Sequence, residues 1–122
     1  MKALLVALVV LSASGCAVPD PAEFRSRPSQ DYLTNASADE IIGCIKSRGA
    51  NDIEITPYPN SGRVELTVST YKRFQTVTLH MATITPRDGG SQVSVRTSSG
   101  GGWVRSESEF RKLISECAPP AA

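Results

Sequence analysis

The sequence predicts an α+β fold: a two-layer domain with the order helix, four-stranded antiparallel sheet, helix, and with both helices on one face of the sheet. Two capping boxes, each opening an amphipathic stretch, predict the helices. Between them, segments of alternating apolar and polar residues are separated by turn residues, which is typical of a meander with one solvated face. We expect this domain to occupy residues 37–118.

The first 15 residues have the order of a secretory signal peptide. A positive start, Met1-Lys2, precedes an unbroken apolar run from Ala3 to Leu11, and small residues then lead to Cys16. The run is much shorter than the roughly 20 residues that cross a bilayer as a helix. We therefore expect residues 1–15 to be cleaved off.

The end of this segment, Ala13-Ser14-Gly15-Cys16, resembles the lipobox of bacterial lipoproteins. The resemblance implies that the chain is cut before Cys16 and that this cysteine carries acyl chains, which would hold the protein on a membrane. By similarity to lipoprotein sorting in enteric-type bacteria, Ala17 after the cysteine implies the outer membrane, facing the periplasm. The alternative is an ordinary signal peptide followed by a soluble secreted protein.

Residues 16–36 contain Pro19, Pro21 and Pro28 and show neither a helical nor a strand period. We interpret them as the lipidated cysteine and a flexible tether, which would span roughly 25 Å on average. Tyr32 and Leu33 are expected to pack on the edge of the domain, the alternative being a short partner-binding segment.

The first helix is predicted to begin at the capping box Ser37 to Glu40 and to end near Gly49, which can adopt a left-handed conformation. The second begins at the capping box Ser106 to Glu109 and is ended by Pro119 and Pro120. Residues 119–122 are expected to be a frayed tail.

Four alternating segments between the helices predict the strands, and prolines after the first of them indicate an edge strand. In the third segment the alternation changes phase, so we expect Val77, Leu79 and Met81 to face the helices and a bulge near Met81 to Thr83. The same phase places His80 on the solvated face. The four segments are 53–56, 63–70, 75–85 and 92–97.

The three cysteines bear on both anchoring and folding. Cys44 and Cys117 fall on the apolar stripes of the two predicted helices, which share one face of the sheet. In an oxidising compartment we expect a disulfide bond between them, the alternative being two buried thiols. Acylation of Cys16 would account for the odd cysteine, which favours the lipoprotein over the soluble form.

Two isolated features carry little chemistry. His80 is the only histidine, and without a nearby carboxylate or thiol signal it makes neither a catalytic triad nor a metal site. Gly100 to Gly102 precede a helix but lack a phosphate-binding fingerprint. We predict no catalytic residue, no metal site and no cofactor. Tyr71, Phe74 and Trp103 are the aromatic residues that we expect to contact a partner.

Loss of Lys2 with the signal would leave 12 basic and 12 acidic side chains. This balance gives no excess of positive charge for phosphates, so nucleic acid is excluded as a partner. The leading hypothesis is a small, non-enzymatic envelope lipoprotein that docks on another envelope protein. The alternative is a periplasmic module that binds a small ligand or a glycan through loops near Trp103.

Overall fold

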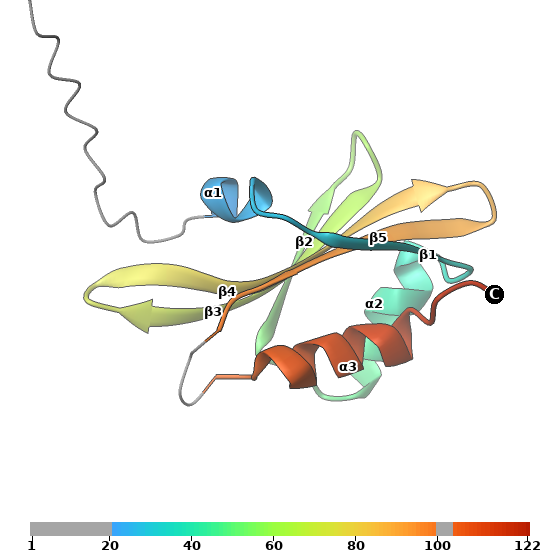
Figure 1. Cartoon of the computed structure of the whole chain (residues 1–122). Coiled ribbons are helices and arrows are strands. Elements are labelled where there is room, and N and C mark those ends of the chain that lie inside the picture. Colours follow the sequence, from blue (N-terminus) through green and yellow to red (C-terminus); the bar gives the residue numbers. More distant parts are fainter. Residues whose placement is uncertain (1–20, 100–103) are drawn as a thin grey trace, which may run out of the picture.

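The computed structural model describes residues 21–99 and 104–122, which form one antiparallel sheet and three helices. The strand order is β1-β5-β4-β3-β2, and helices α2 and α3 cover one face while α1 lies on the other (Figure 1). The α+β class and the four-stranded meander β2 to β5 are as predicted. The elements are α1 (Pro21–Arg25), β1 (Gln30–Thr34), α2 (Ala38–Ser47), β2 (Ile53–Tyr58), β3 (Arg63–Lys72), β4 (Gln75–Arg87), β5 (Gly90–Thr97) and α3 (Glu107–Cys117).

Both predicted capping boxes begin helices. The Ser37 hydroxyl accepts a hydrogen bond from the Glu40 amide at 3.2 Å, and the Ser106 hydroxyl accepts one from the Glu109 amide at 3.2 Å. These bonds satisfy amides that would otherwise lack a partner in the first turn. Gly49 follows α2 with φ of 66°, the conformation that its lack of a Cβ allows.

The main core lies between the sheet and the α2–α3 layer. A disulfide bond between Cys44 and Cys117 joins the two helices across a sequence separation of 73 residues, as predicted. Its fully buried residues come from both helices, from the three central strands and from the residue after α3: Ile41, Ile45, Leu66, Val68, Ala82, Ile84, Val93, Phe110, Ile114 and Ala118.

The prediction of a flexible tether over residues 16–36 is wrong for its described part. Pro21 opens α1, where its fixed φ suits the first turn, and the Phe24 side chain is fully buried. Residues 30–34 form β1, which pairs with β5 and makes the sheet five-stranded. Five-residue elements are too short to show a period, and their formation depends on the β5 edge and the sheet surface that they cover.

An ion pair holds α1 on the sheet. Arg25 Nε and Nη2 donate to the two carboxylate oxygens of Glu65 at 2.7 and 2.8 Å. Burial by itself would raise the pKa of Glu65, but hydrogen bonds from Arg25 and Tyr58 bring it below its usual value. Phe24 and Met81 are buried on this side of the sheet, outside the main core, so the face that was predicted to be solvated is partly covered.

The tail predicted at residues 119–122 is also part of the sheet edge. Thr34 forms an isolated antiparallel bridge with Pro120, and the Ala121 amide donates to the Leu33 carbonyl at 2.7 Å. The prolines end α3 as expected, but the chain then turns along β1 and bonds its outer edge.

The bulge lies in a different place from the predicted one. Val68 pairs with His80 but Ser69 pairs with Thr78, so Leu79 is the extra residue in β4. A shift of one residue exchanges the two faces of a strand. His80 therefore faces the helices beside Val68, whereas Met81, opposite Thr67, faces α1; both assignments reverse the expectation.

Replacing Cys44 or Cys117 with Ser should lower the free energy of unfolding by similar amounts, about 4 kcal/mol in the chain-entropy model of a closed loop of this length. The double replacement should cost little more than either single one, because both remove the same bond. Urea unfolding of the three variants measures this, and clearly additive losses would contradict a shared bond.

Phe24→Ala should lower the free energy of unfolding by about 3–5 kcal/mol, because it empties a fully buried site. Phe74→Ala is the matched control: the same atoms are removed where the side chain is 91% exposed, and the change should stay within about 0.5 kcal/mol. Equal effects of the two replacements in urea unfolding would show that residues 21–25 are not packed on the domain.

Candidate functional site

The end of the β3–β4 hairpin projects from the domain. Pairing of β2 with β3 ends at Ile53 and Val68, and pairing of β5 with β4 ends at Thr97 and His80. Residues 69–78 therefore pair only with each other among the described strands, and we call this two-stranded segment the arm. Figure 1 shows the arm as the yellow hairpin that extends to the left beyond the helices.

The turn at the end of the arm is strained. Lys72 pairs with Gln75, so Arg73 and Phe74 are the two turn residues, and their φ angles are 48° and 65°. Two-residue turns with positive φ at both positions fit the twist of a hairpin but favour Asn and Gly. A residue with a Cβ costs about 1–2 kcal/mol in this region. Phe74 recovers nothing by burial, since 91% of it is exposed.

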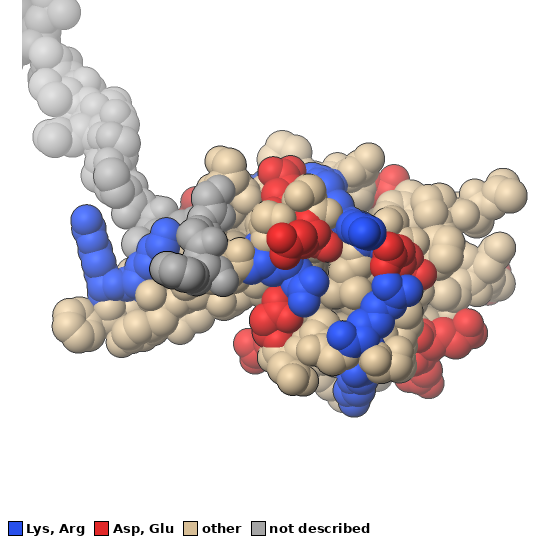
Figure 2. All heavy atoms as spheres, turned by 90° about the horizontal axis from the view of Figure 1, so that it is seen from below, with Lys and Arg blue, Asp and Glu red and all other residues tan. Residues whose placement is uncertain are grey.

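The arm carries positive charge and has no acidic residue of its own. No Asp or Glu occurs between Glu65 and Asp88. Lys72 and Arg73 form no ion pair within the described part of the chain, whereas Arg25, Arg48 and others are paired on the body of the domain. In Figure 2 the projecting end shows Lys and Arg side chains in blue and none in red, while both colours mix over the helical side.

The structure brings two of the three predicted contact residues together. Tyr71 and Phe74 lie at the tip of the arm and are 67% and 91% exposed. Trp103 lies outside the described residues. Sequence reasoning missed Lys72 and Arg73, which lie between the predicted strand segments 63–70 and 75–85. The stretch lacks the Asn-Gly signature of a two-residue turn, so the hairpin tip gave no signal of its own.

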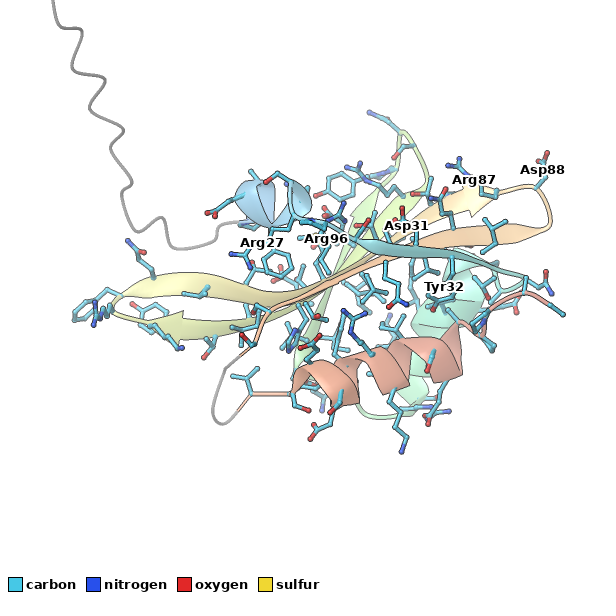
Figure 3. The ribbon with its side chains drawn as sticks, viewed as in Figure 1. Arg27, Asp31, Tyr32, Arg87, Asp88 and Arg96 are labelled. Carbon is cyan, nitrogen blue, oxygen red and sulfur yellow. A yellow bond between two sulfur atoms is a disulfide. The ribbon has the colours of Figure 1, made fainter. Side chains whose placement is uncertain are left out.

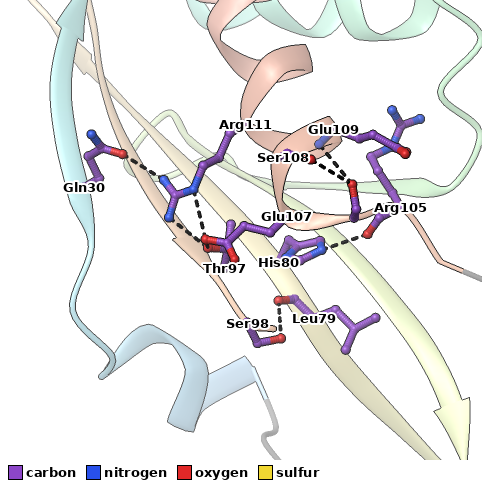
Figure 4. A network of polar contacts seen from close by, with 11 residues as sticks. Gln30, Leu79, His80, Thr97, Ser98, Arg105, Glu107, Ser108, Glu109 and Arg111 are labelled. Atoms are coloured by element: carbon purple, nitrogen blue, oxygen red, sulfur yellow. Dashed lines mark hydrogen bonds and ion pairs between the residues drawn. The ribbon is translucent and has the colours of Figure 1, made fainter. Parts of the chain in front are cut away.

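His80 has a structural role instead of the solvated position that was expected. Its ring is fully buried and stacks on Phe110 with 5.3 Å between the ring centroids. Nε2 lies 2.9 Å from the Arg105 carbonyl oxygen, which makes it the protonated nitrogen, and the buried Nδ1 has no hydrogen-bond partner among the described residues (Figure 4). Burial lowers the pKa of His80, so the ring is neutral at pH 7.

Beside His80, Arg111 of α3 connects the helix with the edge of the sheet (Figure 4). Its guanidinium donates to Gln30 Oε1 and Thr97 Oγ1, each at 2.8 Å, and Nε lies 3.3 Å from a Glu107 carboxylate oxygen. These contacts hold α3 against β1 and β5. They engage all three nitrogens of Arg111, which also lines the groove described next.

An open groove of about 360 Å³ runs between β1 and α3, with Val95 and Ile114 among its apolar lining residues. Tyr32 points into it from β1 (Figure 3), but its hydroxyl donates to the Ala118 carbonyl at 2.8 Å. The Tyr32 hydroxyl and the Arg111 guanidinium, which both line the groove, are thus already bonded within the protein. On the opposite face, Arg96 Nε donates to the Arg27 carbonyl at 2.9 Å, and the Arg27 guanidinium lies over the Phe24 ring of α1 (Figure 3).

Residues 21–99 and 104–122 contain no group of three His, Cys, Asp or Glu side chains that could hold a metal ion. None of the helices in these ranges is both long and apolar enough to cross a membrane. No protein-family model matches the chain, and searches of curated proteins and of solved structures found no significant match.

The buried His80 should make stability depend on pH in a defined window. The pKa of His80 is lowered in the folded state. Below about pH 6.5, the imidazole is therefore protonated in the unfolded chain but still neutral in the folded protein. The free energy of unfolding should be constant above this pH and fall below it, by up to about 1.4 kcal/mol per pH unit. Urea unfolding between pH 5 and 6.5 measures this, and His80→Phe should remove the slope; equal slopes would refute the assignment.

Replacing Arg73-Phe74 by Asn-Gly should raise the free energy of unfolding by about 1–2 kcal/mol, because both residues tolerate positive φ. The control is Ala at both positions, which removes the same side chains but keeps a Cβ in each strained position, and should give no gain. If the Asn-Gly and Ala-Ala variants are equally stable in thermal or urea unfolding, the turn stores no strain.

Proposed function

We propose that this protein is a non-enzymatic envelope lipoprotein, held on a membrane by acyl chains on Cys16, that docks on another envelope protein through the tip of the arm. The observation that carries the docking proposal is the exposed Phe74 in a strained turn. Strained backbone is retained where the rest of the structure over-determines it, and such positions cluster at binding sites. Tyr71, beside it, is of a type enriched at binding hot spots.

The position of α1 supports an anchored and oriented domain. Only five peptide steps separate Cys16 from Pro21, the first residue of α1. Even fully extended, these steps span at most roughly 18 Å. The fold would therefore sit close to the lipid headgroups, in place of the longer excursion that a tether ending at residue 36 would allow. The proposed compartment is the periplasmic side of the outer membrane.

The non-enzymatic part of the proposal is supported by the place of the chain's only histidine. His80 is packed on Phe110 and bonded to a backbone carbonyl, and no carboxylate in residues 21–99 or 104–122 hydrogen-bonds to its ring. Its neutral ring connects β4 with the segment before α3 through the hydrogen bond to the Arg105 carbonyl, which is a structural role.

Two measurements test the proposal. The intact mass of the protein from membranes should show an acylated chain that begins at Cys16 and gains two hydrogens on reduction. A photoreactive phenylalanine analogue at position 74 should cross-link in cells to a protein, whereas the same analogue at Leu33, 58% exposed on β1, should not. An unacylated chain would refute the anchor, and equal cross-linking from both positions would refute docking by the arm.

A further inference from the structure

We propose that the surface met by the arm is a recess in the partner protein, with an apolar floor that takes the Phe74 ring and an acidic rim that faces Lys72 and Arg73. The inference rests on the proposed docking function and adds the shape and charge of the partner's site.

The shape of the tip requires a concave partner. Phe74 is one of only two residues in the turn, with the paired strands directly behind it, and its ring is 91% exposed. A flat surface would contact only the outer part of such a ring. Removing the whole side chain from water, which is worth about 1.5–3 kcal/mol, needs walls on several sides. Hot-spot aromatic residues are typically buried in pockets of this kind.

The charge of the tip favours an acidic rim. Lys72 and Arg73 directly precede Phe74 in the chain and have no ion-pair partner among the described residues. The nearest acidic residue before them, Glu65, is only 2% exposed and already binds Arg25. The positive potential at the tip is therefore uncompensated within the described structure. Carboxylates around the recess would steer the arm into it and fix its orientation.

A lipid surface fits the tip less well than a preformed recess. The acyl chains proposed on Cys16 contribute about 0.8 kcal/mol for each buried methylene, so aromatic contacts at the headgroups would add little to membrane retention. A fluid surface also gains nothing from a turn held at a fixed geometry. A rigid partner does, because an element that is already ordered loses less entropy on binding.

The test uses the full-length acylated protein in its own membranes, with the photoreactive phenylalanine analogue at position 74. Lys72→Glu with Arg73→Glu should reduce the cross-linked product at least tenfold, whereas Lys72→Arg with Arg73→Lys should retain it. The matched control is Lys46→Glu with Lys112→Glu, the same charge change at two exposed lysines on the helical side, which should leave the product unchanged. Sequencing the cross-linked peptide should place it in a recess lined by Asp or Glu.

Each contrary outcome has its own meaning. A protein product that persists in the Lys72→Glu, Arg73→Glu variant would overturn the acidic rim and leave docking by the arm intact. A cross-linked peptide on a flat or convex surface would overturn the recess. Cross-linking to lipid alone, or no product from position 74 in the unmodified background, would overturn the docking function together with this inference.

Discussion

The pairing of β3 with β4 is the constraint on which the rest of the structure depends. Two pieces of regular ladder meet at Leu79, where β4 carries one residue more than β3. On the sheet side of this point, Ala82 and Ile84 face α2 and α3 and complete the main core. On the far side the ribbon leaves both neighbouring strands. A bulge bends a strand and increases its twist, so one extra residue both terminates the sheet and directs the arm away from it.

The same shift explains the burial of His80 and of Met81. It places His80 against Phe110, where the ring supports the segment that leads into α3 through the Arg105 carbonyl. It also leaves Met81 on the opposite face, the face on which α1 and its buried Phe24 side chain lie. Side chains alternate between the two faces of a strand on either side of a bulge. The buried position of His80 in the core and that of Met81 on the α1 side therefore both follow from the register of β4.

The N-terminal segment and the arm give the domain two distinct ends. The Arg25–Glu65 pair, 2.7 Å from Nε to Oε2, binds α1 to the sheet within a few residues of the proposed anchor. Charge pairs of this kind add little net stability where exposed, but Glu65 is buried, so loss of Arg25 would leave its desolvation without an ion pair to offset it. The arm shows the opposite arrangement: exposed aromatic rings, unpaired charge and a turn in poor backbone geometry. Stabilising contacts are therefore concentrated at α1, next to the proposed anchor, whereas the arm, where partner contact is proposed, has an unfavourable turn and exposed apolar surface.

The sequence by itself determined the elements whose signals are local. Capping hydroxyls and apolar stripes placed α2 and α3, alternation placed β2 to β5, and the shared face of the helices brought Cys44 and Cys117 together. These succeed because caps and periodicity act over a few residues. The aromatic character of Tyr71 and Phe74 led to the prediction that they contact a partner, which stays a prediction; that both lie exposed at the tip of an arm was not foreseen.

Only the tertiary structure decided which side of β4 each residue takes, and that residues 21–34 belong to the fold. The position of a bulge depends on the register that lets β4 pair with β3 and β5 while its apolar face packs against α2 and α3. That register could not be predicted from β4 alone, and His80 and Met81 lie on the faces opposite to those expected. α1 and β1 have five residues each, which is too short for a helical or strand periodicity of apolar residues to be recognised in the sequence. They form because the folded sheet provides an ion-pair partner for Arg25 (Glu65), a buried site for the Phe24 side chain and an edge on β5 with which β1 can pair. All three depend on the tertiary structure and cannot be read from the local sequence.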